Sequence, residues 1–104
     1  MKKKQGKKLE YVIVRCQKAG VHAGYLVAED DKGFVRLKDS RRLWYWKGAA
    51  TLSEVAVYGA KDVAACRFAV KLPSLSIPLT DVGEIIACQK AGQKMIEKQP
   101  EWRA

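Results

Sequence analysis

The chain has 104 residues, of which 48% are hydrophobic and 30% are charged, and its formal net charge at pH 7 is +9. The composition is globular, and the length suits one domain that buries roughly 60–70% of the surface exposed by the unfolded chain. The composition argues against a disordered protein. A membrane protein is not expected either, because no apolar run approaches the roughly 20 residues that span a bilayer and no apolar signal segment opens the chain. The sequence therefore predicts a soluble, cytoplasmic, single-domain protein without a membrane partner.

Residues 1–8 are predicted to be a disordered basic tail, which leaves residues 9–104 as one domain. The lysines of the tail carry more than half of the net charge: Lys2, Lys3, Lys4, Lys7 and Lys8. Such an arm attracts nucleic acid without sequence specificity. The alternative is that the tail only keeps the protein soluble.

Residues 9–46 are predicted to form a meander of strands. In the first strand, at 9–16, side chains alternate between two faces, and Val12 and Val14 lie on the apolar face. Three further strands complete the meander: residues 25–29, 34–38 and 41–46. Gly20 and Gly24, four apart, favour a turn, a bulge or a close backbone approach. The pair Asp39-Ser40 is predicted to break the third strand from the fourth.

A short helix is predicted to follow the meander. Thr51 and Glu54 have the spacing of a capping box, and Gly59 is placed to end the helix in a left-handed conformation. Residues 60–65 are connective or helical. Residues 67–72 alternate as another strand, and Pro73 marks its edge or its end.

The last third of the chain is predicted to hold a strand and a second helix. Residues 74–80 suit an edge strand or an extended loop, and residues 82–88 a final strand. A helix is expected at 89–99, stopped by Pro100, with Trp102 folding back on the body. The predicted fold is thus α+β, with a strongly bent, mostly antiparallel sheet of five or six strands and two short helices.

The three cysteines and the single histidine argue against a metal centre. Cys16, Cys66 and Cys88 are widely spaced and form no CxxC pair with which His22 could complete a zinc site. We expect reduced, buried thiols, no metal and no cofactor.

The stretch around the fourth strand combines indoles with cations. On a strand, Arg42, Trp44 and Trp46 share one face. An indole face stacks on a nucleobase, an arginine binds phosphate, and the start of a helix presents free amides to an anion. The predicted ligand-binding residues are Arg41, Arg42, Trp44, Trp46 and Lys47, the amides around Ala50 and Thr51, and Arg15 and His22 from the neighbouring strand and turn. The alternative is that Trp44 and Trp46 are core residues.

Three segments carry a resemblance to a known family: VRCQKAGVHAGYL (14–26), RRLWYWKGAATLSEVAVYG (41–59) and EIIACQKA (84–91). From about Tyr11 to Trp102 the chain resembles small phage and prophage proteins known mainly as a domain of unknown function. Gly83 stands where that family has a larger apolar residue. The resemblance implies a viral protein in the cytoplasm of an infected bacterium and supplies no catalytic residues.

Proteins in that setting often act by stoichiometric binding, including the capture of cyclic nucleotides with which bacterial immune systems signal. We therefore predict a non-enzymatic protein that sequesters a small anionic nucleotide and so inhibits host defence. The sequence has no HExxH motif, nucleophile elbow or P-loop. Two alternatives stay open: a nucleic-acid-binding accessory protein that uses Lys90, Lys94 and Lys98, and a structural or protein-interaction component that forms a homo-oligomer.

Overall fold

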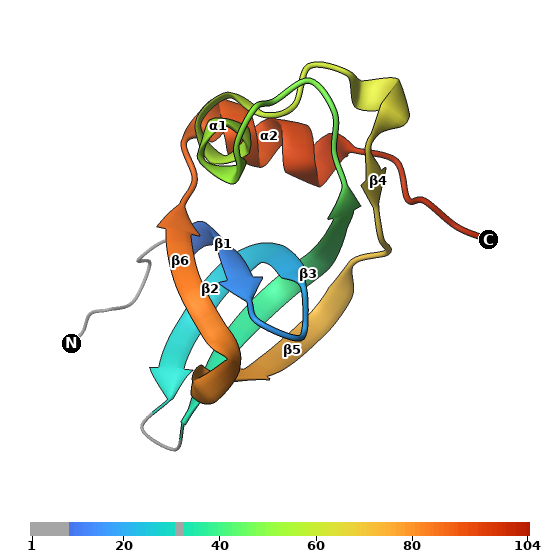
Figure 1. Cartoon of the computed structure of the whole chain (residues 1–104). Helices are drawn as coiled ribbons and strands as arrows, with labels where there is room; N and C mark the ends of the chain where they lie inside the picture. Colours follow the sequence, from blue (N-terminus) through green and yellow to red (C-terminus); the bar gives the residue numbers. More distant parts are fainter. Residues whose placement is uncertain (1–8, 31–32) are drawn as a thin grey trace.

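The computed structural model describes residues 9–30 and 33–104, which form a six-stranded sheet and two helices (Figure 1). The strands are β1 (Glu10–Cys16), β2 (Val21–Asp30), β3 (Phe34–Tyr45), β4 (Arg67–Phe68), β5 (Leu72–Pro78) and β6 (Val82–Ala87). The helices are α1 (Leu52–Tyr58) and α2 (Lys90–Lys98), and the 3-10 turns are η1 (Val63–Ala65) and η2 (Leu79–Asp81). The predicted α+β fold is confirmed, and the predicted tail lies outside the described residues. No helix in the described part of the chain has the length and apolar character to cross a membrane.

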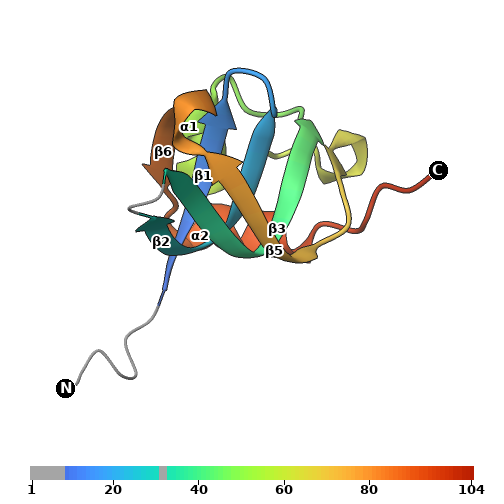
Figure 2. The ribbon, with the colours of Figure 1, turned by 90° about the horizontal axis from the view of Figure 1, so that it is seen from below.

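The sheet is built around β3, the longest strand. The order is β6, β1, β2, β3, and both β5 and β4 pair with the remaining edge of β3. β5 takes the first half of that edge, where Figure 2 shows the two strands side by side, and β4 takes the end near Tyr45. All pairings between the named strands are antiparallel, as predicted.

The sheet buries side chains on both faces. On one face Ile13 packs with residues of the two helices, among them Val55. On the other face Val12 packs with Leu37 and Ile77 inside the curve of the sheet. Because successive side chains of a strand point to opposite faces, β1 contributes to both cores. This explains why β1 is apolar almost throughout.

A bulge bends β3 where the sequence predicted a break. Tyr25 pairs with Lys38 and Ala23 with Arg41, so two residues of β3 oppose Gly24 alone. The extra residue, Asp39, has a φ of 51°. A bulge increases the twist of a strand without ending it. The prediction of separate third and fourth strands was therefore wrong, and β3 continues through Asp39-Ser40.

Gly24 is required at this bulge because the backbones approach closely. A Cβ added at Gly24 would lie 2.9 Å from the Cα atom of Ser40. The predicted close backbone approach is thus present at Gly24, while Gly20, with a φ of 89°, supplies the turn between β1 and β2.

The second half of the chain contains one more correction. The predicted strand at 67–72 is only two residues long, and Pro73 lies within the following strand, β5. β5 tolerates its prolines because it is an edge strand that pairs only with β3. β6 ends at Ala87, one residue before the predicted boundary.

The two helices have the predicted ends. The Thr51 hydroxyl accepts a hydrogen bond from the Glu54 amide at 3.1 Å, and the Gly59 amide donates to the Val55 carbonyl at 2.9 Å with a φ of 81°. α2 lies across α1 on the same end of the sheet (Figure 1).

The helices touch at Gly92 of α2. A Cβ at this position would overlap the carbonyl of Ala56 in α1. We therefore expect Gly92→Ala to lower the free energy of unfolding by about 1–3 kcal/mol, as overpacked cores do. Urea denaturation measures the change. Ala91→Ser, at an exposed neighbour on the same helix, is the control and should stay within about 0.5 kcal/mol of the wild type; an equally stable Gly92→Ala protein would contradict the packing described.

Candidate functional site

Adjacent arginines at the end of β3 have opposite environments. Arg41 is 1% exposed and points into the core, whereas Arg42 is exposed. The guanidinium of Arg41 donates to the carbonyls of Ala69 (2.8 Å), Ile96 (2.9 Å), Gln99 (2.7 Å) and, at 3.3 Å, Phe68.

These bonds give Arg41 a structural role. The carbonyls belong to the segment after β4 and to the C-terminal end of α2, so one buried side chain joins β3, β4 and α2. Burial lowers the pKa of the guanidinium, which stays charged because the ordinary pKa of arginine exceeds 12. Its donors face protein carbonyls, and we therefore leave Arg41 out of the candidate site.

The two indoles predicted to share a face also separate. The strand ends at Tyr45, and Trp46 turns towards the helix-side core, where it is half-buried. Trp44 stays on the surface with 56% of its area exposed and stacks on Trp102, with ring centroids 4.9 Å apart and planes 11° from parallel. Trp46 is therefore a core-packing residue, and Trp44 belongs to a surface site.

Arg67 of β4 lies against the exposed aromatic rings. Its guanidinium carbon is 5.3 Å from the centroid of Trp102, 5.7 Å from Trp44 and 5.9 Å from Tyr45. Cation–π contacts of this length fix a guanidinium while leaving its N–H edge available. No hydrogen bond or ion pair joins the Arg67 side chain to another residue in the described ranges. We call Trp44, Tyr45, Arg67 and Trp102 the aromatic cluster.

A cavity of about 430 Å³ opens beside the aromatic cluster. Lys47 and the η1 residues Ala64 and Ala65 line it together with Trp44, Tyr45 and Arg67. The Lys47 ammonium has no partner among the described residues. The cavity thus combines aromatic faces with the cations of Lys47 and Arg67, and of the predicted ligand-binding residues it brings together only Trp44 and Lys47.

The start of α1 does not offer the predicted anion site. The Ala50 amide donates to the carboxylate of Glu54 at 2.9 Å, and the Thr51 hydroxyl caps the Glu54 amide. These groups are satisfied within the chain, and the Glu54 charge would repel a phosphate. Ala50 and Thr51 are therefore helix-capping residues.

The remaining predicted residues lie away from this cavity. Arg15 forms an ion pair with Glu84 at 3.3 Å. His22 is buried opposite Arg42 on β2, and its Nε2 donates to the Ala19 carbonyl at 2.8 Å. Burial lowers the pKa of His22, so the ring is neutral near pH 7. Neither these residues nor Arg42 line the cavity beside Trp44.

The described cysteines and acidic residues are scattered over the fold and do not gather into a metal centre. Within residues 9–30 and 33–104, no group of three or more His, Cys, Asp or Glu side chains is placed to hold a metal ion. Burial raises the pKa of Cys16, and that of Cys88 to about 12. Both thiols are consequently protonated at neutral pH and weakly nucleophilic.

Sequence reasoning missed Arg67 and gave Trp102 no role in the site. In the sequence Arg67 is an ordinary strand residue, and its contact with Trp44 depends on the pairing of β4 with β3. Trp102 folds back as predicted, since its amide donates to the Phe68 carbonyl at 2.9 Å. The available sequence signal was Trp102 itself, a tryptophan close to the C-terminus.

Fold and site together define a small antiparallel α+β domain with an aromatic and basic surface site. The chain belongs to a family described as a domain of unknown function (DUF6948), whose model matches residues 9–96. The expected membership of an uncharacterised family is confirmed. No similar curated protein and no similar solved structure were found.

Proposed function

We propose that the protein binds a small anionic nucleotide at the aromatic cluster and does so without catalysis. The observation that carries the proposal is the position of the Arg67 guanidinium, whose carbon lies 5.3–5.9 Å from three ring centroids and whose N–H groups have no hydrogen-bond partner among the described residues. A held guanidinium with a free N–H edge is suited to bidentate contact with a phosphate.

The aromatic rings supply the second half of the recognition. Trp44 and Trp102 are about half-exposed, so each presents indole surface to solvent. A stacked base contributes roughly 1–3 kcal/mol to binding in proteins that use such platforms. The Lys47 ammonium on the cavity wall adds a second positive charge for the phosphate. Base and phosphate are thereby recognised within one cavity.

The biological setting that we propose follows the resemblance to phage proteins. In this setting the protein is a phage product that acts in the cytoplasm of the infected bacterium. It sequesters a cyclic nucleotide signal and so inhibits host antiviral defence. Stoichiometric capture requires only affinity, which the aromatic cluster and its cations support.

A thermal-shift screen tests the proposal. The panel contains cyclic mono-, di- and trinucleotides, ADP-ribose derivatives and a short oligonucleotide, applied to the protein with and without residues 1–8. A ligand that binds only the folded state raises the melting temperature. We expect a rise of several degrees with one small nucleotide, retained without the tail. No rise with any small nucleotide would contradict the proposal.

Single-stranded nucleic acid is the second candidate ligand. Lys90, Lys94 and Lys98 are all exposed along one face of α2 and form a stripe that could follow a phosphate backbone. Binding through this stripe and the tail should weaken steeply as salt concentration rises. A shift that occurs only with the oligonucleotide and disappears with the tail would favour this candidate over the first.

A further inference from the structure

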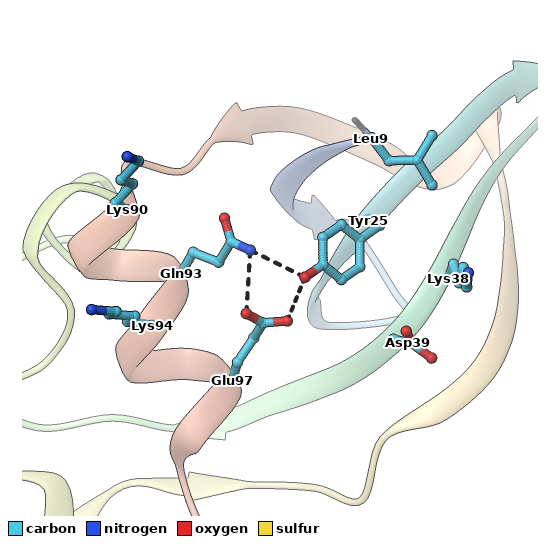
Figure 3. Close-up of a pocket in the computed structure, with 8 residues that line it drawn as sticks. All are labelled: Leu9, Tyr25, Lys38, Asp39, Lys90, Gln93, Lys94 and Glu97. Carbon is cyan, nitrogen blue, oxygen red and sulfur yellow. Dashed lines mark hydrogen bonds between the residues drawn. The ribbon is translucent and has the colours of Figure 1, made fainter. Parts of the chain in front are cut away.

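A second cavity lies between α2 and the bend of β2 and β3, away from the aromatic cluster (Figure 3). Its volume is about 720 Å³, within the range of roughly 300–1,000 Å³ typical of small-molecule sites. The bulge residue Asp39 forms part of one wall, and α2 forms the opposite wall. None of the predicted ligand-binding residues lines it.

One wall of the cavity is a fixed polar network (Figure 3). The Tyr25 hydroxyl donates to Glu97 Oε2 at 2.7 Å and accepts from Gln93 Nε2 at 3.2 Å. Gln93 Nε2 also lies 3.2 Å from Glu97 Oε1. The bond to Glu97 raises the pKa of Tyr25, so the phenol remains protonated. These bonds leave the Gln93 carbonyl oxygen free to accept a hydrogen bond from a ligand.

Three ammonium groups flank this network. Lys90 and Lys94 extend from α2 on one side, and Lys38 extends from β3 on the other (Figure 3). None of the three forms an ion pair or hydrogen bond with another residue of the described chain. The Asp39 and Glu97 carboxylates on the same lining offset two of these three positive charges, so the cavity keeps a net charge of about +1 (3 − 2). An anionic group entering the cavity would supply the missing counter-charge.

The cavity also requires hydrogen-bond donors from its ligand. The Asp39 carboxylate has no partner among the described residues, and the Gln93 carbonyl oxygen is free as well. Both groups are hydrogen-bond acceptors, which do not suit the ionised oxygens of a phosphate because these are acceptors too. Hydroxyl groups on the ligand would satisfy them. The Tyr25 ring and Leu9 add apolar surface for a carbon framework.

We propose that this cavity binds a phosphorylated sugar. Its phosphate lies among Lys38, Lys90 and Lys94, and its hydroxyl groups donate to Asp39 and Gln93. The proposal does not rest on nucleotide binding at the aromatic cluster, because the two sites share no residue. Either site can therefore be disproved without affecting the other.

Isothermal titration with ribose 5-phosphate tests the proposal, with ribose and inorganic phosphate as separate titrants at the same ionic strength. We expect ribose 5-phosphate to bind more tightly than either ribose or inorganic phosphate alone. Lys38→Ala and Lys90→Ala should each weaken its binding by roughly tenfold. Asp39→Asn, which keeps a residue tolerant of positive φ, should weaken ribose 5-phosphate binding but not that of inorganic phosphate.

Lys71→Ala is the matched control, because Lys71 is exposed and does not line this cavity. Its affinity for ribose 5-phosphate should equal that of the wild type. The proposal is overturned if ribose 5-phosphate binds no better than inorganic phosphate, or if Lys71→Ala weakens binding as much as Lys38→Ala. Circular dichroism of each variant establishes that it is folded.

Discussion

Replacing Arg41 with alanine is expected to lower the free energy of unfolding by roughly 3–5 kcal/mol, because a buried polar group left without its hydrogen-bond partner costs about 1–3 kcal/mol. Four backbone carbonyls would lose their donor, at Phe68, Ala69, Ile96 and Gln99. Domains of this size are stable by about 5–15 kcal/mol. The variant should therefore unfold at a much lower urea concentration or fail to accumulate as folded protein.

Arg41→Met separates hydrogen bonding from packing. Methionine fills much of the arginine stem volume but donates to none of the carbonyls, so this variant should also be strongly destabilised. Arg42→Ala, at the exposed neighbour, should change stability by no more than about 0.5 kcal/mol. Wild-type stability of Arg41→Met would show that the carbonyl contacts contribute little to the fold.

Replacing Arg67 or Trp44 with alanine is expected to reduce affinity for the nucleotide found by thermal shift by roughly tenfold or more. Arg67→Ala removes the hydrogen-bond donors to the phosphate. Trp44→Ala removes a stacking surface that contributes about 1–3 kcal/mol to binding, and about 1.4 kcal/mol of binding free energy corresponds to a tenfold change in Kd. Both side chains are exposed, so stability should change little. Isothermal titration measures the affinity and urea denaturation the stability.

Lys71→Ala serves as the control for these titrations as well, since it removes an exposed cation outside the aromatic cluster and its cavity. Trp44→Phe should retain part of the affinity, because a phenyl ring still stacks on a base. Unchanged affinity in both Arg67→Ala and Trp44→Ala would place the ligand elsewhere on the protein.

The fold was predictable wherever the signals were local. The alternation of Val12 and Val14 identified a strand, and Thr51 and Gly59 identified the ends of α1. The bulge at Asp39 was not predictable, because it depends on the close approach of Gly24 from another strand. The local sequence showed only the polar pair Asp39-Ser40, which is typical of a loop between two strands.

The bulge also determined which part of the site was predictable. Leu37, before the bulge, packs in one core and Leu43, after it, in the other, because the extra residue reverses the alternation of β3. Arg41 consequently points into the helix-side core with Leu43. An aromatic and basic surface near Trp44 was predictable from the residues around it. The arginine that contacts Trp44, Arg67, could not be predicted, because it lies on β4, which is far from Trp44 in the sequence.

The most direct test of nucleotide binding at the aromatic cluster is a two-dimensional ¹H–¹⁵N NMR titration that follows the indole N–H signals. The chain has three tryptophans, so three such signals are expected, assigned by single Trp→Phe variants. Binding should shift the signals of Trp44 and Trp102 in parallel with saturation and leave that of Trp46, which packs against the core, in place. A saturating ligand that moves neither the Trp44 nor the Trp102 signal would contradict the proposed site.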